Sequence, residues 1–131
     1  MLEQTRIPVR STLAETFPYS RAVRIGNVIT VSGTGAYGPD GNIVGPRDPY
    51  QQAVRIYQII DDALRHFGAT RNDVARVGIY VTNIKHWEAV GRAHKEYFFS
   101  EPPAVTLTQV SALLYPEMLV LIDAMAVVAE S

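Results

Sequence analysis

The sequence predicts an α+β domain in which two amphipathic helices cover one face of a mixed β-sheet, as a two-layer sandwich. Three observations support this prediction. The chain has 131 residues, of which 47% are apolar, and this suits a single domain with its own core. Two segments carry apolar residues at helical spacing, whereas the other apolar segments are short and alternate. The order along the chain is strands, helix, strand, helix and two strands, so residues 1–131 are treated as one domain.

The first part of the chain has the pattern of strands joined by turns. Residues 4–9 suit a short edge strand, because prolines near an edge leave no ladder hydrogen bond unmade. Residues 22–32 are typical of a hairpin whose turn is Gly26-Asn27, since both residue types accept a positive φ. The stretch 32–48 is rich in glycine and proline but lacks the spacing of a phosphate-binding loop. We interpret it as a long connection built from turns.

The first long helix has clear start and stop signals. Asp48 is expected to be its N-cap, Pro49 its first residue and Gly68 the glycine that ends it. Between them, an aromatic and aliphatic stripe at helical spacing predicts a core-facing side. The remaining expected elements are a strand at 74–82, a second helix capped by Asn83 and running to about 98, and strands at 105–110 and 118–128.

Composition argues against several classes of function. There is no cysteine, which excludes disulfides, thiolate zinc sites and a cysteine nucleophile. No cluster of ligand residues has metal spacing, so no metal or cofactor is expected. The 12 basic residues are scattered among 13 acidic ones, so nucleic acid is not an expected partner. No apolar run approaches about 18 residues and no secretory segment is visible, so we expect a soluble cytoplasmic protein without membrane contact.

The sheet face that the helices leave open would still carry Val, Leu and Ile side chains. Monomeric proteins rarely expose a large apolar patch. We therefore expect this face to be buried by association of identical chains.

Asp123 is the most unusual residue of the sequence. It lies inside the last strand, flanked by Leu121, Ile122, Ala124 and Met125. An ionised carboxylate in an apolar setting costs several kcal/mol unless it is paired or hydrogen-bonded. Three alternatives follow for Asp123. It forms an ion pair with an arginine at an interface, it acts as a general acid/base or orients a water molecule, or it is simply exposed at the strand end.

Tyr19 and Ser32 are further candidates. Tyr19 precedes the hairpin and is either a core aromatic residue or a lid over a site. Ser32 lies where a strand enters the glycine-rich loop, a position from which polar groups reach clefts. The three histidines all fall on the expected helices, and His94 lies on an apolar stripe as a packing residue. A Ser-His-Asp triad is therefore not expected.

Several short motifs occur together in a recognisable order. They are Pro18-Tyr19-Ser20-Arg21-Ala22-Val23, Gly26-Asn27, Val31-Ser32-Gly33, Val81-Thr82-Asn83, Tyr97-Phe98, Pro103-Ala104 and Ile122-Asp123-Ala124-Met125-Ala126-Val127. In this combination the chain resembles the Rid family, the reactive-intermediate deaminases also called the YjgF family, over about residues 18–128.

The resemblance implies a chorismate-mutase-like α+β fold and a homotrimer, with the sheets inside and the helices outside. It also implies three clefts between subunits that bind small carboxylates. In the deaminating members, an arginine directly after Pro-Ala clamps the substrate carboxylate. A glutamate on the last strand positions the water that hydrolyses a 2-imino acid to a 2-oxo acid and ammonia.

Carried over by position, Tyr19, Ser32 and Gly33 match the residues that line the family's pocket. Asp123 takes the place of the glutamate and is one methylene shorter. Val105 takes the place of the arginine, and valine cannot make the bidentate pair that a guanidinium makes with a carboxylate.

The loss of the arginine leaves three alternatives. Another arginine, such as Arg92 or Arg24, could supply the clamp. The cleft could instead take an uncharged or differently shaped imine, enamine or carbonyl compound, read by the hydroxyls of Thr106, Thr108 and Ser32. In the third alternative, the cleft binds a metabolite without converting it.

The resemblance thus predicts a trimer that hydrolyses or binds a small reactive metabolite in a cleft between subunits. For hydrolysis, Asp123 would orient the water, Tyr19 would cover the pocket, and Ser32 with the Gly33 N–H would hold the substrate oxygen. The competing class is a non-catalytic, ligand-sensing trimer. An endoribonuclease activity, which relatives are also named for, is disfavoured because there is no basic patch.

Overall fold

The computed structural model describes residues 1–129 and confirms the predicted α+β class. Its strands form one mixed six-stranded sheet in the order β1-β2-β3-β6-β4-β5, in which only β4 and β5 run parallel. The elements are β1 (Gln4–Pro8), α1 (Thr12–Thr16), β2 (Ser20–Ile25), β3 (Val28–Thr34), α2 (Pro49–His66), β4 (Val74–Val81), α3 (Trp87–Tyr97), β5 (Ala104–Gln109) and β6 (Val120–Val127), with short 3-10 helices at Arg71–Asp73 and Ile84–His86.

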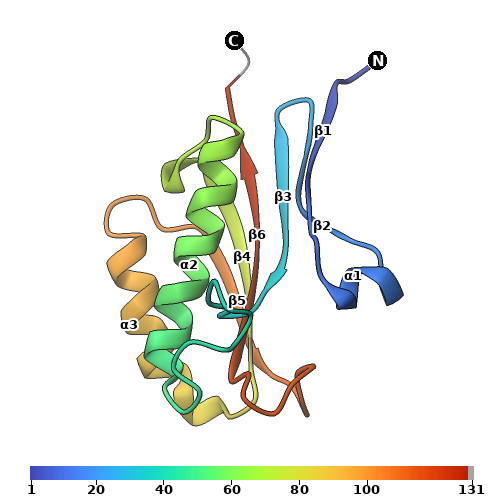
Figure 1. Ribbon diagram of the computed structural model, residues 1–131. Coiled ribbons are helices and arrows are strands. Elements are labelled where there is room, and N and C mark those ends of the chain that lie inside the picture. The colour runs from blue at the N-terminus through green and yellow to red at the C-terminus, as the bar shows by residue number, and fades with distance from the viewer. Residues whose placement is uncertain (130–131) are drawn as a thin grey trace.

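Helices α2 and α3 lie side by side and cover one face of the sheet (Figure 1). The core lies between these two layers. From α2 it takes the predicted stripe, including Ile56, Ile60 and Leu64, which are fully buried. From β6 it takes Ile122 and Ala126, which point toward the helices. The alternation along β6 therefore decides which of its side chains face the helices and which face the opposite side, here called the open face.

The predicted start and stop signals of α2 are confirmed. The side chain of Asp48 accepts hydrogen bonds from the backbone N–H groups of Tyr50 (3.0 Å) and Gln51 (3.1 Å). Pro49 lies in the first turn, where its missing N–H costs nothing. Gly68, just after the C-cap, has a φ of 77°, which glycine adopts without strain.

The predicted N-terminal hairpin is also present. β2 pairs with β3 in antiparallel register around the Gly26-Asn27 turn, and Gly26 has a φ of 60°. β1 adds to β2 as the edge strand, and its ladder shifts register at Pro8. Proline at this edge position confirms the expectation from the sequence.

Three elements differ from the prediction. The second helix begins at Trp87, because Asn83 caps a separate 3-10 turn by accepting from the N–H of Lys85. Trp87 is 56% exposed and does not join the core. The last strand covers Val120–Val127 rather than 118–128. Helix α1 was not predicted, since five residues capped by Ser11 are too few to show a helical period.

The open face of the sheet carries exposed apolar side chains. Met125 and Val127 of β6 are 37% and 43% exposed, and Val28 beside them on β3 is 36% exposed. Figure 1 shows α1 next to β1 and β2, away from α2 and α3. Within residues 1–129, no helix is long and apolar enough to cross a membrane.

Candidate functional site

Asp123 lies at the centre of the open face, on a strand with neighbours on both sides. One carboxylate oxygen, Oδ1, accepts a hydrogen bond from the N–H of Gly78 at 3.1 Å. The other, Oδ2, accepts from the hydroxyl of Tyr80 at 3.1 Å. Among the described residues the only ion pair is Arg65–Asp61, so within one chain Asp123 is held by neutral donors and not by an arginine.

Gly78 is what allows this close approach. A Cβ atom at this position would lie 2.7 Å from Oδ1 of Asp123 and 3.0 Å from the hydroxyl oxygen of Tyr80. The first distance is too short for a methyl group unless the carboxylate moves, and the second is a tight contact. The carboxylate also acts on its donor: the hydrogen bond to Asp123, and then the negative charge of Asp123, raise the pKa of the Tyr80 hydroxyl.

The register of β3 against β6 places Ser32 and Gly33 beside Asp123. Val31 pairs with Ala124 and Thr34 pairs with Ile122, so two residues of β3 lie opposite the single residue Asp123. This is a β-bulge, which re-aims the backbone of the bulged strand. Ser32 donates its hydroxyl proton to the carbonyl of Ser20 at 2.6 Å, and so offers an incoming ligand its acceptor lone pairs.

Strand β5 continues the same row on the other side. Gly78 pairs with Thr106, so the row across the sheet is Ser32–Gly33, Asp123, Gly78 and Thr106. Val105 pairs with Val77, which is fully buried beneath the helices. Since neighbouring residues of a strand point to opposite faces, Val105 and Asp123 lie on opposite faces of the sheet in one chain.

The two arginines named as alternative clamps lie elsewhere. The guanidinium of Arg92 stacks on the ring of Tyr50, 4.0 Å from its centre, in the helix layer. Arg24 donates to the backbone carbonyls of Gly26 (2.9 Å) and Phe67 (2.7 Å), and so ties the hairpin to the end of α2. The structure does not bring either of them to the row around Asp123.

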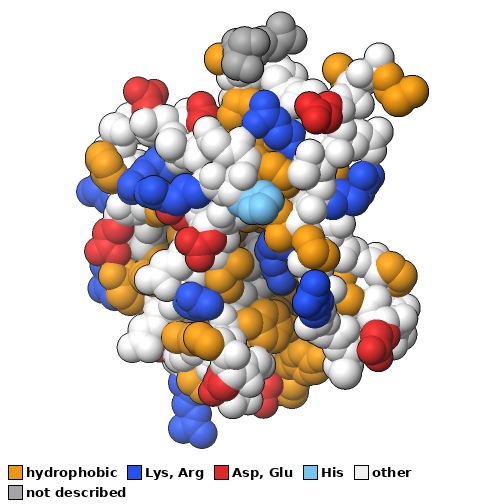
Figure 2. All heavy atoms as spheres, turned by 45° about the horizontal axis from the view of Figure 1, so that its top comes forward, with side chains coloured by type: hydrophobic (Ala, Val, Ile, Leu, Met, Phe, Trp, Pro, Cys, Tyr) orange, Lys and Arg blue, Asp and Glu red, His pale blue; other side chains and the backbone are white. Residues whose placement is uncertain are grey.

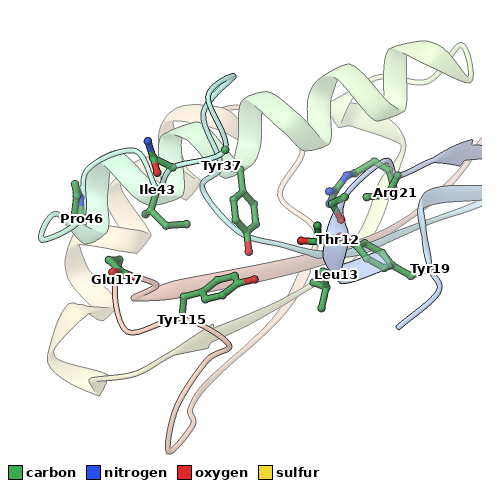
Figure 3. A pocket seen from close by; sticks show the side chains of 13 residues that line it. Thr12, Leu13, Tyr19, Arg21, Tyr37, Ile43, Pro46, Tyr115 and Glu117 are labelled. Atoms are coloured by element: carbon green, nitrogen blue, oxygen red, sulfur yellow. The ribbon is translucent and has the colours of Figure 1, made fainter. Parts of the chain in front are cut away.

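A groove begins at the Ser32–Gly33 end of the row that contains Asp123. Two adjoining cavities of about 350 and 730 Å³ share Leu13, Tyr19, Arg21 and Tyr37 as common walls. Figure 3 shows the side chains that line the larger one. The smaller one reaches Ser32 and Gly33 of the bulge. The other lining residues of the smaller cavity are Phe17, Gly35, Leu113, Leu114, Met118 and Leu121, and the larger one continues to the loop 41–46 and to Tyr115 and Glu117.

Tyr19 is therefore a wall of the groove, and three residues that the sequence did not single out join it. Figure 3 shows Tyr37 and Tyr115 close together, with Arg21 on the same side as Tyr19. The pKa of the Tyr37 hydroxyl is raised by burial and then by the neighbouring Tyr115 and Tyr19, while the charge of Arg21 opposes this. The available signal was that Arg21, at the start of β2, is only two residues from Tyr19.

Other kinds of site have no support in the part of the chain that is described. It contains no group of three or more His, Asp or Glu side chains that could hold a metal ion. The ring nitrogen Nδ1 of His94 lies 2.7 Å from the hydroxyl of Tyr57, between α2 and α3. Burial lowers the pKa of His94. His94 is thus a packing residue of the helix layer.

Fold and site together define a small α+β protein with an acid at the centre of its open sheet face, beside an aromatic groove. The family model described as endoribonuclease L-PSP matches residues 9–128. The chain therefore belongs to this family, whose members are also called YjgF, RutC or Rid proteins, as the motifs indicated.

Two curated relatives illustrate the match. A Streptomyces coelicolor protein described as uncharacterized is 33% identical over 118 residues, which are 90% of this chain and 87% of that protein. A RutC family protein of Pyrococcus abyssi is 31% identical over 96 residues, 73% of this chain and 76% of its own length. Among solved structures, Rv2704 of Mycobacterium tuberculosis, a member of the YjgF/YER057c/UK114 family, superposes with a TM-score of 0.86 at 36% identity, covering 96% of this chain and 100% of that one.

Proposed function

We propose that this protein hydrolyses a small reactive imine, enamine or related carbonyl compound at Asp123, next to the bulge of Ser32 and Gly33. The observation that carries the proposal is the way in which Asp123 is held. Two neutral donors fix its carboxylate at the centre of the open face, and the groove opens beside it. Each oxygen accepts one hydrogen bond, so each keeps a lone pair for water or substrate.

The chemistry needs one base and one oxygen-binding group. Asp123 would take a proton from a water molecule as its oxygen attacks the C=N carbon. Asp123 would pass this proton to the imine nitrogen, giving a neutral carbinolamine. It would then take the hydroxyl proton of the carbinolamine and deliver it to nitrogen as the C–N bond breaks, giving a carbonyl compound and ammonia. The Gly33 N–H would donate to the oxygen of the intermediate and the Ser32 hydroxyl would accept from its O–H group, while Tyr19 would cover it.

We further propose that the working unit is a homotrimer with the open faces inward. Its support is the exposed apolar surface of Val28, Met125 and Val127, which lies next to the row of Asp123 on the open face. Association would bury that surface and complete a cleft around each carboxylate.

Hydrolysis can be tested with a panel of imines generated in situ from amino acids, by following formation of the 2-oxo acid and ammonia. With Val105 in place of the arginine, 2-iminobutanoate should show no more than weak turnover. Asp123→Asn keeps the shape of the side chain but removes the base. We expect it to lower kcat at least about 100-fold, the usual contribution of a general base. Asp62→Asn, an exposed acid on α2, is the matched control and should retain full activity. Equal rates for native protein and Asp123→Asn would refute the proposed role.

A non-catalytic, ligand-sensing protein is the second candidate, and the absence of an arginine at Val105 favours it. Small molecules that raise the melting temperature without any product from a panel of imines would support it. RNA is a weaker candidate. On the face shown in Figure 2, Lys and Arg side chains are interspersed with acidic and apolar ones and do not form the continuous basic surface that phosphate backbones need.

A further inference from the structure

Arg21 is a positive charge in the groove that no carboxylate among residues 1–129 pairs with. Its guanidinium makes one hydrogen bond, from Nη1 to the hydroxyl oxygen of Thr34 at 3.3 Å. Within residues 1–129 no carboxylate lies within ion-pair distance of it. A guanidinium offers five N–H donors in a rigid plane, so most of those of Arg21 remain free.

Contacts with Thr34 and Tyr19 fix the position of the Arg21 guanidinium. Thr34 is completely buried, and it fixes its own hydroxyl by donating to the carbonyl of Ser32 at 2.8 Å. The remaining lone pairs of that hydroxyl face Arg21. On its other side, the guanidinium carbon lies 5.9 Å from the centre of the Tyr19 ring, within reach of a cation–π contact. Arg21 is therefore held at the wall that both cavities share.

We infer that Arg21 is the anion anchor of this groove and that the ligand is a small organic carboxylate with an apolar, ring-bearing body. The inference takes the groove of the proposed function as its site, but it does not require turnover. Arg21 would bind the carboxylate with its free N–H groups, from the β2 side of the groove and independently of position 105. Arg–carboxylate pairs of this kind are short and geometrically specific.

The rest of the groove suits a ring more than a short chain. Three phenol rings, those of Tyr19, Tyr37 and Tyr115, stand around the space next to Arg21 (Figure 3). On the bulge side, the walls are apolar and include Leu13, Met118, Leu121, Leu113 and Leu114. Cavities of about 350 and 730 Å³ fall in the range that holds ligands much larger than a four-carbon acid.

Glu117 sets a further limit on the ligand. It is the acidic side chain of the lining and stands at the end of the groove away from Arg21, with Tyr37 between them (Figure 3). A second negative charge at that end would be repelled. The groove should therefore prefer a monocarboxylate over a dicarboxylate of similar size.

Calorimetric titration with phenylpyruvate tests the inference, with its uncharged methyl ester as the matched ligand. The native protein should bind the acid at least 10-fold more tightly than the ester. Arg21→Gln should lose at least 10-fold in affinity for the acid and leave the ester unchanged, which also shows that the groove is intact. Arg21→Lys should lie between the two, because an ammonium cannot form the bidentate pair. Arg65→Gln removes the same charge from an exposed site on α2 and should bind like the native protein.

Three results would overturn the inference: no binding of phenylpyruvate at millimolar concentration, equal affinity for acid and ester, or an Arg21→Gln affinity within twofold of native. The fate of the proposed function is read separately. Binding that depends on Arg21, without any turnover of imines, would refute the proposed hydrolysis and support Arg21 as the anion anchor. Turnover that depends on Asp123 but not on Arg21 would support the proposed hydrolysis and refute Arg21 as the anion anchor.

Discussion

At the scale of single residues, Gly78 allows the carboxylate of Asp123 to lie directly against the backbone of β4. A methyl group on residue 78 would meet Oδ1 of Asp123 at 2.7 Å and force the carboxylate away from its donors. We expect Gly78→Ala to lower the free energy of unfolding by about 1–3 kcal/mol, as overpacked substitutions do. Urea denaturation measures this change, and any activity that depends on Asp123 should fall with it.

Gly91→Ala provides the matched control for Gly78→Ala. Gly91 lies inside α3 and an added Cβ would contact nothing within 4 Å. Alanine there should raise stability by about 0.5–1 kcal/mol, since glycine is the poorer helix former. In an Asp123→Ala background the cost of Gly78→Ala should shrink, because the clashing oxygen is gone. An unchanged cost would show that the strain lies elsewhere.

The sequence identified some of these residues and not others, for a physical reason. Asp123 stood out because a carboxylate in an apolar strand is costly, but its contact with Gly78 was not predicted. That these two residues touch depends on pairing between β4 and β6, because they are 45 positions apart in the chain. Arg21 was missed because its role depends on a bond to Thr34 across the hairpin and on a turn near Tyr115.

At the scale of elements, the packing of α2 on α3 includes a group that titrates. Burial lowers the pKa of His94 below the ordinary value of about 6.5. The unfolded chain therefore takes up a proton at a higher pH than the folded one. The contribution of His94 is complete above about pH 6.5 and is lost as the pH falls below it. Urea denaturation at pH 7.5 and pH 5.5 should show a less stable protein at the lower pH.

His94→Gln should reduce this pH dependence, because glutamine does not titrate and can still bond the hydroxyl of Tyr57. His66→Gln, at an exposed position near the end of α2, should behave like the native protein. The same pH dependence in His94→Gln and in the native protein would contradict the assignment.

Elements were predictable where their apolar pattern repeats over many residues or where a cap or turn residue gives a strong local signal. The cap at Asp48, the stripe of α2 and the Gly26 turn all follow from local chemistry. The start of α3 was misplaced by one turn, since Asn83 caps either kind of helix equally well in sequence. Packing against neighbouring elements decides whether a 3-10 turn or an α-helix follows a cap, and this packing cannot be read from a single sequence.

At the scale of the whole molecule, the sheet order determines which residues lie at the centre of each face of the sheet. Inserting β6 between β3 and β4 places its alternate residues at the centre of both faces. On one face this gives the buried core of Ile122, Ala124 and Ala126. On the other it gives Asp123 among exposed apolar side chains, which a sequence can foresee by alternation but cannot assign to a partner.

The proposed trimer is tested by placing a charge on that open face. Met125 is 37% exposed and Val127 is 43% exposed, so an aspartate at 125 should be tolerated by an isolated chain but not in a dry interface. We expect light scattering to give about three times the chain mass of 14.5 kDa for the native protein and a smaller species for Met125→Asp. Ile84→Asp, at a 46% exposed position next to the helix layer, should remain trimeric. A native monomer would leave the carboxylate of Asp123 open to water, and would refute the intersubunit cleft while leaving the binding test on Arg21 intact.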